Sequence, residues 1–298
     1  MCVISTLLAL VQATMTDTAA RASQPGVRGG AEFRIPLGSL LVPGLGQYLY
    51  GAPVSGGGLT ATAVGGVVLY LTGDTAALRA SDLPRHSDGQ RAVVGAQLYL
   101  TAGGLSAYDA FGRALPALQA KGRYTFLTAH DPTVSLLAAP FDPKFLGRWT
   151  TWADLAFTTI VAAILVESET HPGALYEPFR LRDGAFAAAL SWNAGVGEEA
   201  LFRGWLYPLF HETFGRRFWL SNGAQAALFG VLHPQAGRYA VLIGAWAFYE
   251  GWLTRRNGWS IRESVFHHFW YDVVIVTATL LTDKRGASVT VTFPRIRF

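Results

Sequence analysis

The sequence has few of the residues that build soluble enzymes or disulfide-linked domains. Charged residues make up 15% of its 298 positions, well below the roughly 25% of an average soluble domain. The one cysteine, Cys2, excludes an intrachain disulfide and a thiolate metal cluster. Basic and aromatic residues are not interleaved in a pattern that binds nucleic acid, so we expect no nucleic-acid partner.

The sequence is rich in apolar residues instead. Hydrophobic residues make up 51% of the chain, and 33 glycines and 9 tryptophans occur in it. This composition is typical of a polytopic helical membrane protein, in which glycines permit close helix packing. The formal net charge of +4 fits loops that contact anionic lipid headgroups. We therefore expect an all-α integral membrane helix bundle with membrane lipid as a partner.

Apolar runs predict about seven or eight membrane spans. The runs cover residues 37–50, 56–72, 92–111, 150–166, 184–210, 218–233, 239–254 and 264–281. Basic residues flank the carboxy-terminal runs almost equally on both sides, so the positive-inside rule assigns no orientation.

The same pattern divides the chain into five parts. Residues 1–35 are a leader that we expect to be flexible, with a short surface helix as the alternative. Residues 36–112 form an amino-terminal membrane hairpin module, and residues 113–149, which contain four prolines, form a linker. Residues 150–283 form a carboxy-terminal core. Residues 284–298 are a tail that makes either a short strand or a surface segment.

The hairpin module contains the segment Pro43-Gly44-Leu45-Gly46-Gln47. It resembles a signature of small prokaryotic membrane hairpins. Because the segment is rich in helix-breaking residues, we interpret it as close helix packing through glycine rather than as a binding site.

An otherwise apolar helical run carries two adjacent glutamates and an arginine: Glu198, Glu199 and Arg203. On insertion scales, a charge at the bilayer centre costs roughly 2.5–3.5 kcal/mol, so such residues need partners. Glu199 and Arg203 are four residues apart and share a helix face, where they can form an ion pair. Glu198 projects about 100° away around the helix and is free to contact other groups.

Two further helices bring polar groups into apolar surroundings. His233 follows Phe229 by four residues, so the two rings share a helix face. Asp272 follows His268 by four residues, and we expect it to hydrogen-bond the His268 ring and fix its tautomer. Any one of these groups alone has a structural explanation. Placing all six polar groups of these three helices in lipid for a structural purpose alone would cost much free energy.

Other polar or large residues of these helices are interpreted as structural. His267 points elsewhere on its helix than His268, and His211 lies at a helix end, where the helix dipole favours it. Glu250 is expected to pair with an arginine. Trp192 and Asn193 are expected to serve packing.

The three motifs resemble those of a known family. Glu198-Glu199-x-x-x-Arg203, Phe229-x-x-x-His233 and His268-x-x-x-Asp272 are similar, in order and spacing, to the motifs of the CPBP family. That family includes type II CAAX prenyl endopeptidases, bacteriocin-processing proteins and abortive-infection proteins. The resemblance covers residues 150–283 and does not extend to the amino-terminal half.

The resemblance implies a membrane-embedded glutamate protease that uses no cofactor. Glu198 and His233 would hold and activate the attacking water, and Glu199 and Arg203 would orient that pair. Hydrolysis without a nucleophilic serine or cysteine needs such a base, together with donors for the tetrahedral oxyanion.

By the same resemblance, His268 and Asp272 would stabilise the oxyanion. Asparagine is common in the family at the position of Asp272, where its amide can donate. An ionised aspartate cannot donate a hydrogen bond, so Asp272 is either protonated or acts by orienting His268.

Two other functions stay open at this point. Two glutamates and two histidines could bind zinc in a tetrahedral site, although the zincin spacing is absent after His211 and Glu212. A non-catalytic membrane scaffold, regulator or transporter is the second alternative. A transporter is expected to contain inverted repeats, and we find no internal repeat.

The expected substrate is a peptide or a membrane protein. A prenylated CAAX peptide is the substrate of eukaryotic relatives, whereas the composition and the Pro43–Gln47 segment are typical of bacteria. We therefore expect a bacterial inner (cytoplasmic) membrane location. The sequence does not predict the oligomeric state.

Overall fold

The computed structural model describes residues 30–78, 83–169, 179–233 and 240–282. Every regular element within these four ranges is helical, as predicted, and they contain no β-strand. The first 29 residues of the predicted leader and the predicted tail lie outside the described residues.

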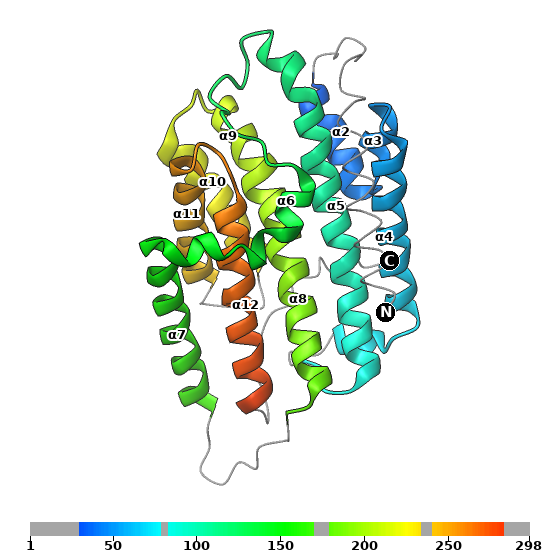
Figure 1. Cartoon of the computed structure of the whole chain (residues 1–298), viewed down its shortest axis with the longest axis vertical. Helices are drawn as coiled ribbons and strands as arrows, with labels where there is room; N and C mark the ends of the chain where they lie inside the picture. Colours follow the sequence, from blue (N-terminus) through cyan, green and yellow to red (C-terminus); the bar gives the residue numbers. More distant parts are fainter. Residues whose placement is uncertain (1–29, 79–82, 170–178, 234–239, 283–298) are drawn as a thin grey trace.

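The amino-terminal helices pack along one long helix, α5 (Ser87–Gln119), and form one side of the molecule (Figure 1). They are α2 (Ala31–Leu41), α3 (Leu45–Leu49) and α4 (Pro53–Leu71), followed by the short 3-10 helix η2 (Thr75–Leu78). Helix α5 extends past both ends of the predicted run 92–111, and it continues through Pro116. This length lets α5 also contact the carboxy-terminal helices.

The segment Pro43–Gln47 joins these helices to α5. The side-chain amide of Gln47 donates to the backbone carbonyl of Ser106 at 3.0 Å, and the Ser106 hydroxyl donates to the Gln47 amide oxygen at 2.8 Å. A Cβ atom on Gly46 would lie 2.5 Å from the Cβ of Ala110. Only a glycine permits this approach, so the interpretation as close packing is confirmed.

Residues 120–148 cross the molecule between α5 and α7 (Figure 1). They contain α6 (Thr133–Ala138), η3 (Ala139–Phe141) and η4 (Pro143–Gly147), after which α7 (Trp149–Glu169) begins. Asp131 in this segment accepts hydrogen bonds from the Ile261 N–H at 2.9 Å and the Ser260 hydroxyl at 3.1 Å. Burial raises the pKa of the Asp131 carboxyl above its usual range, and both hydrogen bonds oppose that rise. The segment thereby holds the start of the last helix.

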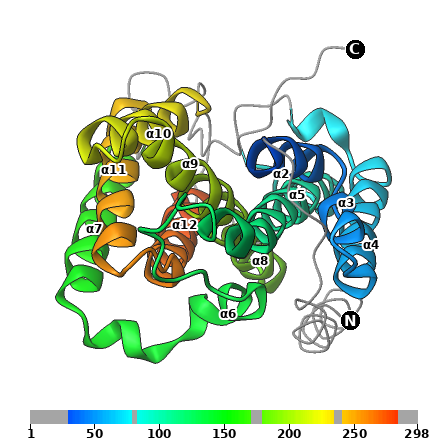
Figure 2. The same ribbon diagram turned by 90° about the horizontal axis from the view of Figure 1, so that it is seen from above.

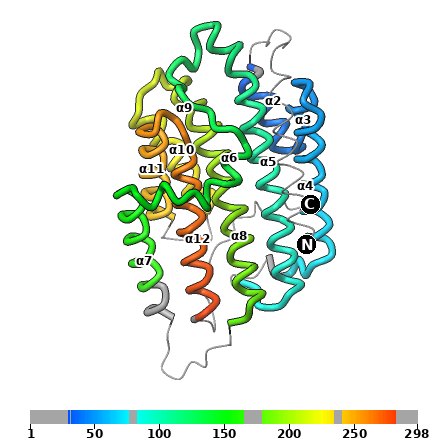
Figure 3. Tube along the Cα trace, in the orientation of Figure 1, coloured from blue at the N-terminus to red at the C-terminus, as the bar shows by residue number. Residues whose placement is uncertain are grey.

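The carboxy-terminal bundle surrounds that last helix, α12 (Arg262–Thr282), as Figure 2 shows from above. Its other members are α8 (Leu181–Glu199), η5 (Ala200–Leu206), α9 (Tyr207–Thr213), α10 (Phe218–Val231) and α11 (Ala240–Arg256). Helix α12 packs against α7, α8 and α11, and α8 and α12 run side by side (Figure 3). The polar residues of α12 therefore face several helices at once.

The helix that carries the paired glutamates changes its hydrogen bonding next to them. The sequence predicts one helical run over 184–210, but α8 ends at Glu199 and continues as a π-helical segment, η5. A Cβ atom on Gly204 would lie 2.6 Å from Cε2 of Tyr108 in α5. Short π-helical segments within α-helices are frequent at functional sites.

Two helices, Pro53–Leu71 and Arg262–Leu281, are long and apolar enough to cross a membrane. The predicted seven or eight spans are not confirmed by length and hydropathy. Helix α10 has 14 residues, fewer than the roughly 20 that a span needs.

Candidate active site

The structure brings all six predicted site residues together from α8, η5, α10 and α12. Glu198 and Glu199 end α8, Arg203 lies in η5, His233 follows α10, and His268 and Asp272 belong to α12. Among these side chains, Glu199 and Arg203 are fully buried, whereas Glu198, His233 and Asp272 are 20%, 13% and 22% exposed. The cluster thus has an inner part and an outer, accessible part.

Glu198 is the centre of the outer part. Its Oε2 atom lies 3.8 Å from Nε2 of His233 and 3.9 Å from Nε2 of His268. Both separations exceed a direct hydrogen bond. Nδ1 of His233 lies 2.7 Å from the Phe229 carbonyl oxygen. When Nδ1–H donates to that oxygen, the lone pair of the imidazole is on Nε2, toward Glu198.

Glu199 is the centre of the inner part. Its Oε1 atom lies 2.9 Å from Nη1 of Arg203 and 2.8 Å from Nδ1 of His268. The predicted Glu199–Arg203 ion pair is therefore confirmed. The Arg203 guanidinium also lies 4.5 Å from the centre of the Phe229 ring, a cation–π distance. These contacts fix Glu199 and leave it no direct exposure to a substrate.

The predicted contact between Asp272 and the His268 ring is present within α12, but Glu199 is the nearer carboxylate. Glu199 holds the ring at Nδ1, while Asp272 lies 3.5 Å from Nε2 on the other side. Glu199 reaches the ring because α8 and α12 approach closely. A Cβ atom on Gly195 would lie 2.9 Å from the backbone nitrogen of Phe269. A tertiary contact from Glu199 thus adds to the contact of Asp272 within α12.

Aromatic rings enclose the inner part. Trp246 of α11 packs edge-on against His268, with ring centres 5.0 Å apart. Phe229 lies next to His233 and also contacts His268 edge-on at 6.0 Å. Rings of low polarity strengthen the electrostatic attraction among the charges that they surround. The Glu199–Arg203–His268 contacts are therefore well protected from water.

Analysis of the sequence missed Gln97. This residue of α5 is 2% exposed, and its amide nitrogen lies 3.4 Å from Oε1 of Glu198. It reaches the site because a Cβ atom on Gly197 would lie 2.7 Å from Cα of Thr101, so α5 and α8 nearly touch. A polar residue inside the apolar run 92–111 was the available signal.

The remaining polar residues have structural partners. Within the described residues, Glu250 forms no ion pair with an arginine, and its Oε1 atom lies 3.2 Å from Nδ1 of His267. Buried His211 contacts the Ser221 hydroxyl at 2.9 Å. The Trp192 indole donates to the Leu137 carbonyl at 3.1 Å, in agreement with a packing role.

Residues 182–274 match the family model described as Type II CAAX prenyl endopeptidase Rce1-like. This segment, called the Rce1-like domain below, is therefore similar to that family. The predicted resemblance is confirmed over these residues, and the matched family consists of membrane-embedded proteases. Comparisons with curated proteins and with solved structures gave no match.

The Rce1-like domain begins at the second residue of α8 and ends within α12. It therefore contains all six motif residues, Glu198 to Asp272. It does not contain Gln97 of α5 or any residue of α7. The family match thus covers about a third of the chain, and helices outside it complete the surroundings of the site.

Proposed function

We propose that this protein is a membrane-embedded endopeptidase in which Glu198 and His233 activate a water molecule. The separation of 3.8 Å between Glu198 Oε2 and His233 Nε2 supports this role. One water molecule about 2.8 Å from each atom would contact both groups. Glu198 takes the proton as general base while the water oxygen attacks the peptide carbonyl, and it gives that proton to the leaving amine when the tetrahedral intermediate collapses and the C–N bond breaks. The step needs no cofactor.

The inner residues hold the reacting groups in this proposal. Arg203 neutralises Glu199, and Glu199 fixes the His268 ring through Nδ1. Nε2 of His268 then points toward Glu198, 3.9 Å away. From this position, Nε2–H stabilises the tetrahedral oxyanion.

Asp272 acts as a second oxyanion donor in its protonated form. Glu199 already orients His268, so orientation is not a role left for Asp272. Its Oδ2 atom lies 3.5 Å from Nε2 of His268, next to the proposed oxyanion position, and its side chain is 22% exposed. A neutral carboxylic acid there donates as an asparagine amide would.

The proposed setting is a bacterial cytoplasmic membrane, crossed by seven or eight helices of this chain. The two long apolar helices support membrane insertion. The Pro43–Gln47 segment, which resembles one in small prokaryotic hairpins, supports a bacterial source. We therefore propose a peptide or a membrane protein, rather than a prenylated CAAX peptide, as the substrate.

The test compares cells that express the wild type, Glu198→Gln or Glu212→Gln. In the membranes of each, it identifies the protein amino termini that cleavage generates. Glu212 pairs with Arg216 away from the site, so its variant controls for the same chemical change. Cleavage products are expected with the wild type and Glu212→Gln, and not with Glu198→Gln. The same products with folded, membrane-inserted Glu198→Gln would refute the proposal.

A further inference from the structure

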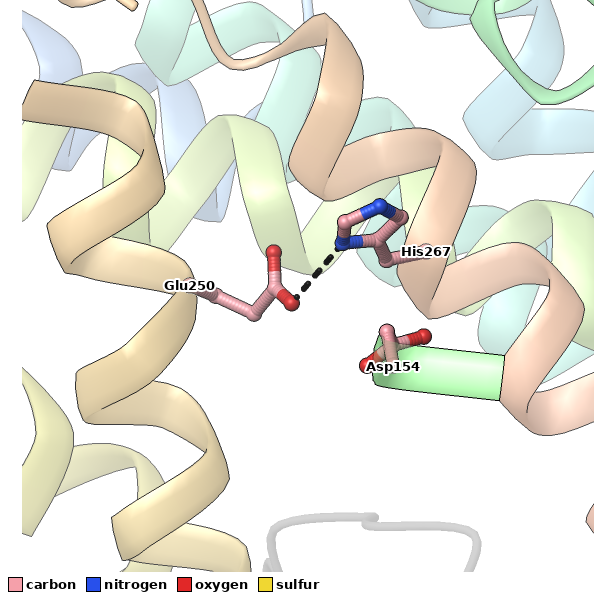
Figure 4. A group of neighbouring side chains, drawn as sticks. All are labelled: Asp154, Glu250 and His267. Carbon is pink, nitrogen blue, oxygen red and sulfur yellow. Dashed lines mark hydrogen bonds and ion pairs between the residues drawn. The ribbon is translucent and has the colours of Figure 1, made fainter. Parts of the chain in front are cut away.

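A second buried polar cluster lies next to the candidate active site. Asp154 of α7, Glu250 of α11 and His267 of α12 converge from three helices (Figure 4). One ligand atom from each lies within 4.8 Å of the others, and each residue is at most 2% exposed. His267 precedes His268, so it projects about 100° away around α12. The sequence motifs assign no role to this cluster.

The hydrogen bonds of this cluster are incomplete. Glu250 Oε1 contacts Nδ1 of His267 at 3.2 Å, and Asp154 Oδ1 accepts from the Trp246 indole at 3.0 Å. The second oxygens, Glu250 Oε2 and Asp154 Oδ2, are buried and have no hydrogen-bond partner. Burying a carboxylate oxygen without a partner is costly. Two such oxygens in one cluster point to a positively charged ligand.

The charges of the cluster lead to the same conclusion. Within the described ranges, neither Asp154 nor Glu250 forms an ion pair with a lysine or arginine. The next acidic residue, Glu263, is already paired with Arg148. Two ionised carboxylates and a protonated His267 together carry one net negative charge, and that charge is buried. A divalent cation with a neutral imidazole balances the two carboxylates.

We propose that Asp154, Glu250 and His267 bind one divalent transition-metal ion, for which Zn²⁺ is the probe. Two carboxylates and one imidazole are a donor set that suits such an ion. Two ligand atoms at about 2.0 Å from a tetrahedral zinc lie about 3.3 Å apart. The separation between Glu250 Oε1 and His267 Nδ1 is 3.2 Å.

Thr151 orients the imidazole for this role. Its hydroxyl lies 3.0 Å from Nε2 of His267. When Nε2–H donates to that hydroxyl, the lone pair of Nδ1 points toward Glu250 and the ion. Metal-bound histidines typically donate their other ring N–H in this way.

The ion has a structural role, because the cluster has almost no exposure. It joins α7 and α11 to α12 behind the candidate active site. Trp246 connects the two clusters, since its indole donates to Asp154 while its ring contacts His268. The ion thus supports the position of His268 without contact with a substrate.

The experiment measures zinc binding to the full-length protein in detergent, after treatment with a chelator. The wild type is expected to bind one Zn²⁺ per chain. Asp154→Asn and Glu250→Gln should each weaken binding by more than about 100-fold, and Thr151→Val by about 10–100-fold. Glu198→Gln is the matched control and should bind zinc as the wild type does. Unchanged binding in folded Asp154→Asn, or loss of binding in Glu198→Gln, would overturn the proposal.

X-ray absorption at the zinc edge of the wild-type protein gives a test that depends on no variant. One imidazole with oxygen ligands is expected. Two imidazoles would assign the zinc to His233 and His268, and no bound zinc would also overturn the proposal. Neither readout measures cleavage, so this inference and the proposed endopeptidase activity fail independently.

Discussion

Two histidines next to each other in α12 belong to two different polar clusters. His268 faces Glu198 and Glu199, in a cluster whose outer side chains are 13% to 22% exposed. His267 faces Glu250 and Asp154, each at most 2% exposed. Both clusters combine histidine with carboxylate side chains. Access to the outside is what differs.

That difference in exposure separates a cluster suited to catalysis from one suited to a structural role. A general base must lie within hydrogen-bond reach of the water and the substrate that react. The partly exposed Glu198 and His233 can meet this condition, whereas the fully buried Glu250 cannot. A structural metal site, by contrast, has a closed set of ligands. The clusters can be told apart by which substitutions change cleavage and which change zinc binding or stability.

The largest expected effect is on catalysis at Glu198. Glu198→Gln should lower kcat by about 10²–10⁴-fold, because it removes a general base and retains the size of the side chain. Unfolding temperature in detergent should change little. If Glu250→Gln lowered kcat as much while its stability and zinc content stayed normal, the comparison between the clusters would be wrong.

The next effect is on stability at the inner part of the site. Arg203→Ala should lower the free energy of unfolding by about 3–5 kcal/mol, because it leaves Glu199 buried and unpaired. Unfolding in detergent, followed by circular dichroism, measures this loss. The double variant Arg203→Met/Glu199→Met removes both charges and should recover part of the stability. No recovery would show that packing, rather than charge, is lost.

Variants of Asp272 test whether the outer part of the candidate active site needs a hydrogen-bond donor or a carboxylate at this position. Asp272→Ala should lower kcat by about 10²–10³-fold, as removal of an oxyanion donor does. Asp272→Asn keeps a donor and should retain activity at neutral pH. Activity of both variants from pH 5 to pH 9 provides the measurement. An inactive Asp272→Asn protein would mean that Asp272 acts as a carboxylate.

Gly197 tests the contact between α5 and α8. A Cβ atom there would lie 2.7 Å from Cα of Thr101, so Gly197→Ala should destabilise the fold by about 1–3 kcal/mol through overpacking. Gly223 is a control, since a Cβ atom there meets nothing within 4 Å. Unfolding temperatures of Gly197→Ala and Gly223→Ala should therefore differ, and equal values would contradict the close contact.

The smallest expected effect is at Gln97. Its hydrogen bond to Glu198 is 3.4 Å long, and a bond to a charged group contributes about 1.5 kcal/mol at the lower end of the usual range. Gln97→Leu should therefore lower kcat/KM by about 10-fold. Steady-state cleavage of a peptide identified in the membrane comparison measures it. An unchanged kcat/KM would mean that Gln97 is not part of the site and that the site lies within the Rce1-like domain.

Contacts within one helix could be predicted from the sequence. The spacing of Glu199 and Arg203 predicted their ion pair, and the family motifs predicted which groups meet. The overall helical class followed from composition. The roles of the six residues and the division into five parts stay predictions.

Contacts between helices could not be predicted in the same way. The pairs Glu250–His267 and Glu199–His268 join residues from different helices, so no fixed spacing marks them. Asp154 was overlooked because a single carboxylate in an apolar run shows neither its depth nor its partner. The π-helical segment contains Gly204, which packs against Tyr108 of α5 in another tertiary contact.

The glycine contact between α5 and α8 has a consequence for the smallest working unit of this protein. A fragment cut to residues 182–274 would lose Thr101 and Gln97, and lipid or detergent would replace them against Gly197 and Glu198. The carboxylate that is proposed to activate water would then border hydrocarbon instead of a protein amide. Helix α5 thus forms one side of the candidate active site, and a shortened protein is expected to cleave a substrate only if it retains this helix.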